Sequence, residues 1–182
     1  QAGIAMENGV LSRRAKELEI MDELTGLYNG PYIRNRLEEE VRRAGRYNRP
    51  CSLVLLDVDE FRQFQEACGG LAGEKVLKAL ADAISVHVKE ADRLGRIGED
   101  EFALILPEKN KREAIEMAEA IRTQISMTRF GTNAPQGKMG LTVSAGVSEN
   151  PIDGPTGQDL LEKAGAALGQ AKKQGKNRVI AA

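Results

Sequence analysis

The feature that most constrains the fold of this chain is a pair of short strand-like segments, Arg93–Ile97 and Glu101–Leu106, joined by Gly98-Glu99-Asp100. So tight a connection predicts a β-hairpin, because parallel strands would need a long crossover between them. The apolar run Cys51–Asp57 is typical of a buried central strand. A hairpin embedded among alternating helices and strands predicts an α/β (α+β) domain, with a mostly antiparallel central sheet flanked by helices.

The remaining elements follow from hydrophobic spacing and from turn residues. Gly26–Pro31 is a predicted turn, and Pro31 suits the first turn of the helix that follows it. Apolar residues at helical spacing predict helices, and short apolar runs predict strands. The predicted helices are 31–47, a short one from about Glu60, 73–89, 110–127 and 159–173, and the further strands are 140–147 and 177–181.

Residues 4–21 are polar, with apolar side chains at intervals that suit one face of a helix. The pattern favours an amphipathic or coiled-coil helix interrupted by Gly9, and a terminal helix without a partner is equally compatible with it. We expect a linker helix at residues 1–21 and one domain at residues 22–182. The chain begins with Gln1 and not with methionine, so we expect it to be part of a longer protein.

Composition excludes several classes of function. With 26 basic and 27 acidic residues, the net charge of -1 gives no electrostatic footprint for nucleic acid. The longest apolar runs are too short to cross a bilayer, and nothing resembles a signal peptide. Cys51 and Cys68 form no disulfide framework, so we expect a cytoplasmic location, with any membrane attachment made by a region outside this sequence. The single histidine, His87, excludes histidine-rich metal clusters.

Acidic residues are concentrated where strands end. Asp57 and Asp59 close the central strand, and Asp100 and Glu101 lie at the hairpin turn. If the hairpin pairs beside the central strand, Asp57 and Asp100 meet at one end of the sheet. Magnesium prefers such oxygen ligands, and two ions can hold a triphosphate and lower the pKa of an attacking hydroxyl. The residues alone also allow a solvated sheet end, or a receiver domain, although a receiver domain has no place for this hairpin.

Five segments of the chain, taken together, resemble the GGDEF family, the diguanylate cyclase domain that condenses two GTP into cyclic di-GMP across a dimer. The segments are DELTGLYN (22–29), LLDVDEF (55–61), RIGEDEF (96–102), SAGVS (144–148) and AKKQGKN (171–177). They match in order and register from about Glu19 to Ile180. The resemblance implies a palm-like fold related to nucleotide cyclases, and a role in bacterial cyclic di-GMP signalling. It also implies a homodimer formed through the N-terminal helix, which would couple the domain to an upstream sensory domain.

The resemblance assigns site residues by position. Asp57 and Asp100, helped by the carbonyl of Val58, would hold Mg²⁺ or Mn²⁺, and Asp100 and Glu101 would be catalytic. The residues that would bind GTP are Phe61, Arg62, Gln65, Glu74, Gly98, Glu99, Lys172 and Lys176. Arg62 stands where the family has a phosphate-contacting lysine, and the two lysines match the basic pair that holds the triphosphate. Taken alone, those lysines are ordinary favourable charges at a helix C-terminus.

Several positions depart from the family pattern. The guanine-reading asparagine and aspartate of the family are Gln65 and Glu74 here, each longer by one methylene. Gly70 stands where a histidine is common, and Gly30-Pro31 replaces an arginine pair that contributes to activation.

Glu99 replaces the second glycine of the signature. We expect a tight turn to need a positive φ there, which strains a side chain, and we expect the carboxylate to repel phosphates. These departures predict that cyclase activity is weakened or lost, and the alternative is a working diguanylate cyclase.

A product-inhibition site in the family uses an RxxD motif just before the signature. The equivalent residues are Lys89 to Asp92, and lysine cannot make the forked contact that arginine makes with a guanine edge or a phosphate. We therefore expect cyclic di-GMP to bind poorly at Lys89 and Asp92, and we favour Lys89 as an ordinary cation near a helix end.

Overall fold

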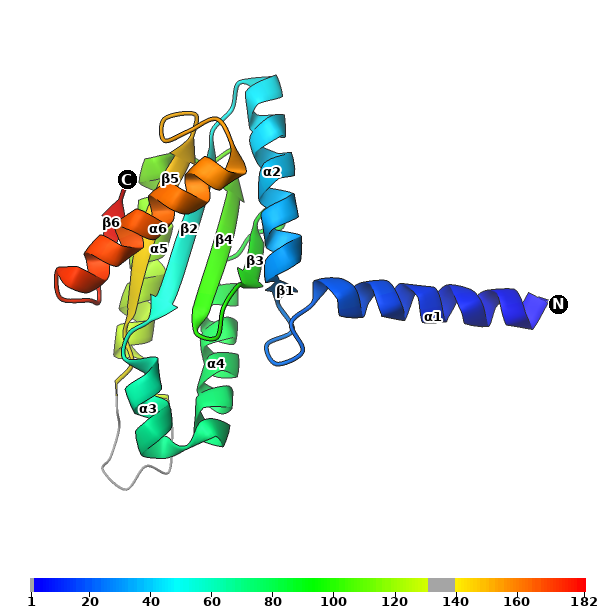
Figure 1. Ribbon diagram of the computed structural model, residues 1–182, viewed down its shortest axis with the longest axis horizontal. Coiled ribbons are helices and arrows are strands. Elements are labelled where there is room, and N and C mark those ends of the chain that lie inside the picture. The colour runs from blue at the N-terminus through cyan, green and yellow to red at the C-terminus, as the bar shows by residue number, and fades with distance from the viewer. Residues whose placement is uncertain (1, 131–139) are drawn as a thin grey trace.

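A computed structural model describes residues 2–130 and 140–182, with backbone only at 2–4 and 14–18. One six-stranded sheet, in the order β1-β3-β4-β2-β5-β6, forms the centre of the molecule (Figure 1). The strands are β1 (Tyr28–Asn29), β2 (Cys51–Val58), β3 (Arg93–Arg96), β4 (Glu101–Pro107), β5 (Val143–Asn150) and β6 (Val179–Ala181). The helices are α1 (Ala2–Ile20), α2 (Gly30–Tyr47), α3 (Phe61–Cys68), α4 (Gly70–Ser85), α5 (Lys111–Met127) and α6 (Gly157–Lys173).

Strand β2 lies at the centre of three layers and is buried along its whole length. It pairs antiparallel with β4 on one side and with β5 on the other. Its side chains alternate between two cores. Val54 and Leu56 pack with α3, α4 and α5, whereas Leu53 and Leu55 pack with α2 and α6 on the other face (Figure 1). This two-sided burial explains why the sequence of β2 is a continuous apolar run.

The predicted sheet is confirmed as mostly antiparallel. Its only parallel pairs in the described part of the chain are β1 with β3 and β5 with β6, both at the edges. The hairpin of β3 and β4 and the buried central strand are also confirmed.

The largest differences from the predicted boundaries are in α4, in β5 and in the predicted turn. Helix α4 begins at Gly70, directly after Gly69 with φ 89, and ends at Ser85, whose hydroxyl donates to the carbonyl of Ala81. Strand β5 begins and ends three residues later than predicted, because it pairs with all of β2 from Cys51 to Val58. Tyr28–Asn29 lies in the predicted turn but pairs with β3.

Helix α2 shows how local sequence sets an element. The side chain of Asn29 accepts a hydrogen bond from the N–H of Tyr32 at 3.0 Å, and Pro31 lies in the first turn, where its missing N–H costs nothing. The helix ends at Asn48, which adopts the left-handed conformation with φ 52.

Helix α1 projects away from the sheet as a separate rod (Figure 1). The helix predicted at the N-terminus is present but runs through Gly9 without the predicted interruption, and its Met6, Val10 and Leu11 side chains are exposed. A turn joins it to the domain, in which the carboxylate of Asp22 accepts hydrogen bonds from the N–H and the hydroxyl of Thr25. In the described ranges, no helix combines the length and the hydropathy needed to span a membrane.

Candidate active site

The predicted acidic site forms where β2 ends beside the turn between β3 and β4. Asp57 is paired in register with Glu101 of β4, and the N–H of Val58 donates to the carbonyl of Asp100 at 3.1 Å. Strand pairing thus brings together residues from segments more than 40 positions apart in the sequence. Asp57 is only 9% exposed, so this end of the sheet is not simply a solvated set of acids.

The carboxylates of this cluster perturb one another. Burial raises the pKa of Asp57, and the charges of Asp100 and Asp59 add to that effect, against the ion pair with Lys172. The pKa of Asp100 is raised by burial and by Glu99, and the pKa of Glu101 by burial and by Asp57. Crowded carboxylates with raised pKa values favour the arrival of positive charge.

Lysines from α6 and the loop after it supply part of that charge. The Nζ atom of Lys172 lies 2.5 Å from Oδ1 of Asp57, in an ion pair without a directed hydrogen bond to that buried oxygen. The Nζ atom of Lys176 lies 3.1 Å from Oε1 of Glu60. Both predicted phosphate-binding lysines therefore lie beside the C-terminal end of β2.

The donor set fits a cation that is shared with a nucleotide. Asp57 and Asp100 offer two carboxylates, and Oδ1 of Asp57 makes no directed hydrogen bond with a described residue. Within residues 2–130 and 140–182, no group of three or more histidine, cysteine or acidic side chains is arranged to hold a metal ion alone. Magnesium is commonly held by one or two carboxylates, with water and substrate phosphates as its other ligands. The site fits such an ion.

Arg96 fixes the hairpin turn in a way that the sequence did not indicate. Its Nε and Nη2 atoms donate to the carbonyl of Glu99 at 3.0 and 2.7 Å, and its Nη1 atom reaches both carboxylate oxygens of Asp22. Burial raises the pKa of Asp22, but the hydrogen bonds from Thr25 and the charge of Arg96 outweigh burial and hold that pKa below its usual value. The guanidinium therefore connects the turn after α1 to the signature turn.

The strain predicted at Glu99 is absent, and that prediction was wrong. Neither Gly98 nor Glu99 has a positive φ. The N–H groups of Ile97 and Gly98 both donate to the carbonyl of Glu101, and Arg96 holds the carbonyl of Glu99, so the turn closes without a left-handed residue. The side chain of Glu99 is exposed, yet its charge still raises the pKa of Asp100. The predicted repulsion between the Glu99 carboxylate and phosphates therefore stays a prediction.

The predicted guanine-reading residues lie at the corner between α3 and α4. Phe61 is buried at the start of α3. The side chain of Gln65 packs closely against Gly73. A Cβ atom on Gly73 would stand 2.9 Å from Cγ of Gln65 and 3.3 Å from Cζ of Phe61. Glu74 is exposed on α4. Arg62 points into solvent, 89% exposed, and pairs with Glu66 one helical turn away, so it does not reach the carboxylates here.

The two side chains of the predicted product site differ in exposure and in their contacts. Lys89 is exposed, whereas the carboxylate of Asp92 is fully buried. Asp92 accepts from the N–H of Lys89 at 2.9 Å and pairs with Nζ of Lys109 at 2.5 Å. Asp92 is therefore already neutralised within the fold.

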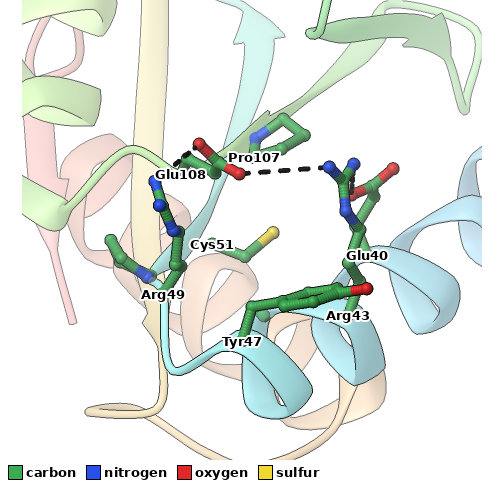
Figure 2. Close-up of a pocket in the computed structure, with 9 residues that line it drawn as sticks. Glu40, Arg43, Tyr47, Arg49, Cys51, Pro107 and Glu108 are labelled. Carbon is green, nitrogen blue, oxygen red and sulfur yellow. Dashed lines mark hydrogen bonds and ion pairs between the residues drawn. The ribbon is translucent and has the colours of Figure 1, made fainter.

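A separate hollow lies at the opposite end of β2 (Figure 2). Cys51 lies on its floor, and Glu108 lies between Arg43 and Arg49 at its edge. Burial raises the pKa of Cys51 to about 12, helped by the nearby charge of Glu40. The thiol stays protonated at neutral pH and is not an activated nucleophile. The hollow contains none of the predicted site residues.

Comparison with protein families matches residues 19–178 to the family described as "Diguanylate cyclase, GGDEF domain". The chain is 34% identical over 164 residues to the response regulator PleD of Caulobacter vibrioides, a match that covers 90% of this chain and 36% of PleD. It is 32% identical over 165 residues to the diguanylate cyclase DgcP of Pseudomonas aeruginosa, covering 90% of this chain and 24% of DgcP. The chain thus spans only a minor part of these relatives.

Solved structures agree with the sequence matches. The coiled coil and GGDEF domain of DgcB from Caulobacter crescentus, in complex with c-di-GMP, superposes with a TM-score of 0.89 at 26% identity, over 100% of this chain and 98% of that one. The diguanylate cyclase SiaD of Pseudomonas aeruginosa, solved with its activator SiaC, superposes with a TM-score of 0.84 at 32% identity, over 100% of this chain and 70% of that one.

Proposed function

The chain belongs to the GGDEF domain family of diguanylate cyclases, and from this premise we propose that it binds GTP with Mg²⁺ or Mn²⁺ and has weak or no cyclase activity. The observation that carries the proposal is the meeting of Asp57 with Asp100 and Glu101 beside Lys172. Crowded, half-buried carboxylates next to a lysine suit a cation and a polyphosphate, whereas a purely structural sheet end would gain nothing from their repulsion.

In this proposal the chain's own groups have separate roles. Asp57, Asp100 and the carbonyl of Val58 would hold the cation, which would supply positive charge against the phosphates and lower the pKa of an attacking hydroxyl. Lys172 and Lys176 bind the triphosphate. Glu101, whose pKa is raised by burial, accepts a proton near the reacting hydroxyl. Gln65 and Glu74 contact the guanine base, and Phe61 and Gly98 also contact the nucleotide.

Two features support weakened turnover. Gln65 and Glu74 each carry one methylene more than the family's guanine-reading residues, and a misplacement of about 1 Å can cost on the order of a hundredfold in rate. Glu99 adds a negative charge beside Asp100, where phosphates must approach. Lys89 and Asp92 are not included as a product site, because the carboxylate of Asp92 is already paired with Lys109.

A working cyclase is the second candidate, and the relaxed backbone at Glu99 favours it.

Because the remaining effect of Glu99 is electrostatic, Glu99→Gln should raise the turnover of GTP to cyclic di-GMP about as much as Glu99→Gly. One unit charge at ~5 Å in water corresponds to about fourfold in rate. Adding Gln65→Asn and Glu74→Asp should raise turnover further. Chromatography of the product formed from GTP and Mg²⁺ measures each step.

The outcomes of that assay separate the two candidates. Brisk product formation by the unaltered protein, unchanged in both Glu99 variants, would establish the working cyclase and make Glu99 a tolerated residue. If Glu99→Gly raises turnover and Glu99→Gln does not, the effect of Glu99 comes from backbone conformation or steric bulk and not from its charge. Failure of the unaltered protein to bind GTP with Mg²⁺ would reject the proposed function.

We further propose that residues 1–21 are a linker helix and 22–182 the GGDEF domain, in a cytoplasmic homodimer controlled by an upstream sensory domain. The exposed side chains of Met6 and Val10 support this, because their spacing puts them on one face of α1. The similarity to a coiled coil and GGDEF domain over the whole chain also supports it.

Removal of residues 1–18 should therefore shift the protein from dimer to monomer in sedimentation velocity. In the full chain, Met6→Asp with Val10→Asp should do the same, because charges on the contact face repel. Glu7→Gln on the same helix serves as the control. If the protein stays dimeric after both the truncation and the aspartate pair, the linker helix does not form the dimer interface.

A further inference from the structure

Asp59 is a buried carboxylate that the proposed roles leave unused. It is 5% exposed, and no described lysine or arginine forms an ion pair with it. Instead it accepts hydrogen bonds from Oγ1 of Thr142 at 2.7 Å, from Oγ of Ser144 at 2.7 Å and from the N–H of Asn177 at 3.0 Å. A buried carboxylate held only by neutral donors joins the end of β2 to two segments about 85 and 118 positions away.

The second of these segments, at Asn177, has an unusual backbone. Gly175, Lys176 and Asn177 have φ values of 116, 63 and 47, so the chain passes through successive left-handed residues as it leaves α6. Two of the three carry side chains, which disfavour this conformation, so the surrounding contacts must hold it. The N–H of Lys176 donates to the carbonyl of Ala171, and the N–H of Asn177 donates to the carboxylate of Asp59.

The residue held in this way is one of the two lysines beside the acidic cluster. Lys176 immediately precedes the N–H that Asp59 accepts, and its own Nζ atom contacts Glu60, the neighbour of Asp59. A buried anchor directly after β2 thus sets where the Lys176 ammonium lies relative to Asp57 near the end of that strand. Arg122 of α5 donates to the side chain of Asn177 at 2.9 Å and supports the loop from the other side.

We propose that Asp59 is a positioning residue for triphosphate binding, which fixes the left-handed loop so that Lys176 faces the phosphates. The inference rests on the proposed function, because it takes the triphosphate as the group that Lys176 binds. It deepens that function by giving the carboxylates separate roles, in which Asp57 and Asp100 bind the cation and Asp59 positions the lysine.

The test compares two ligands. The first is 3′-deoxy-GTP, which lacks the condensing hydroxyl, and the second is GMP, which lacks the β- and γ-phosphates. In calorimetric titration with Mg²⁺, Asp59→Asn should weaken 3′-deoxy-GTP about tenfold and leave GMP unchanged, because a neutral amide oxygen accepts the N–H of Asn177 more weakly than a carboxylate oxygen does. In a Lys176→Ala background, Asp59→Asn should cost nothing further, because its effect passes through that lysine.

Strand β5 offers a matched pair of controls. Ser144 and Ser148 are both fully buried, and each donates one hydrogen bond, Ser144 to Asp59 and Ser148 to the carbonyl of Leu160 at 2.8 Å. Ser144→Ala and Ser148→Ala should lower the melting temperature similarly, and only Ser144→Ala should weaken 3′-deoxy-GTP.

Three results would overturn the positioning role while leaving the proposed function in place. They are unchanged 3′-deoxy-GTP affinity in a folded Asp59→Asn variant, equal losses for 3′-deoxy-GTP and GMP, and additive losses with Lys176→Ala. Absence of 3′-deoxy-GTP binding in the unaltered protein would instead reject the proposed function, and the positioning role with it.

Discussion

Asp57→Ala and Asp100→Ala should each abolish Mg²⁺-dependent GTP binding and leave the protein folded. The two side chains come from β2 and from the hairpin turn, and strand pairing alone brings them together. Losing either removes a cation ligand and leaves the triphosphate facing uncompensated charge, so we expect at least about a hundredfold weaker binding. Calorimetric titration of GTP with and without Mg²⁺ measures the effect.

The same variants should respond differently to the cation before any nucleotide is added. In the unaltered protein Mg²⁺ relieves repulsion among Asp57, Asp100 and Glu101, so it should raise the melting temperature. Asp57→Asn should remove that gain. Asp82→Asn, at an exposed carboxylate on α4, is the control and should keep it. Unchanged GTP binding in both alanine variants would refute the cation assignment.

Gly146→Ala should destabilise the protein by about 3 kcal/mol or more. A Cβ at this position of β5 would lie 1.9 Å from the carbonyl oxygen of Ala164 and 2.5 Å from the N atom of Leu168. Both are backbone atoms of α6 and cannot rotate away, so the helix itself must move. Because α6 carries Lys172, this displacement should also weaken nucleotide binding in whatever protein remains folded.

Urea denaturation followed by circular dichroism measures the loss. Gly165→Ala on the same helix is the matched control, because a Cβ there meets nothing within 4 Å. Replacing a mid-helix glycine by alanine should stabilise the protein by about 0.5–1 kcal/mol. Equal unfolding midpoints for Gly146→Ala and the unaltered protein would show that α6 does not need this close approach to β5.

The sequence alone determined the elements and the acidic end of the sheet, because these depend on short-range patterns. The apolar run of β2 and the close spacing of β3 and β4 leave few alternatives to a central strand beside a hairpin. Pairing those strands necessarily brings Asp57 near Asp100. Motif order over most of the chain indicated the family, which comparison with known proteins then matched over residues 19–178.

Tertiary structure decided how the polar side chains are paired. The contacts of Arg96 with Asp22, of Asp59 with Asn177 and of Lys172 with Asp57 each join residues more than 70 positions apart, so spacing along the chain carries no record of them. Sequence reasoning gave Glu99 a strained turn, because glycine is usual where φ is positive. In the structure no residue of the turn has a positive φ, and Arg96 and the carbonyl of Glu101, which lie outside the turn residues, close it.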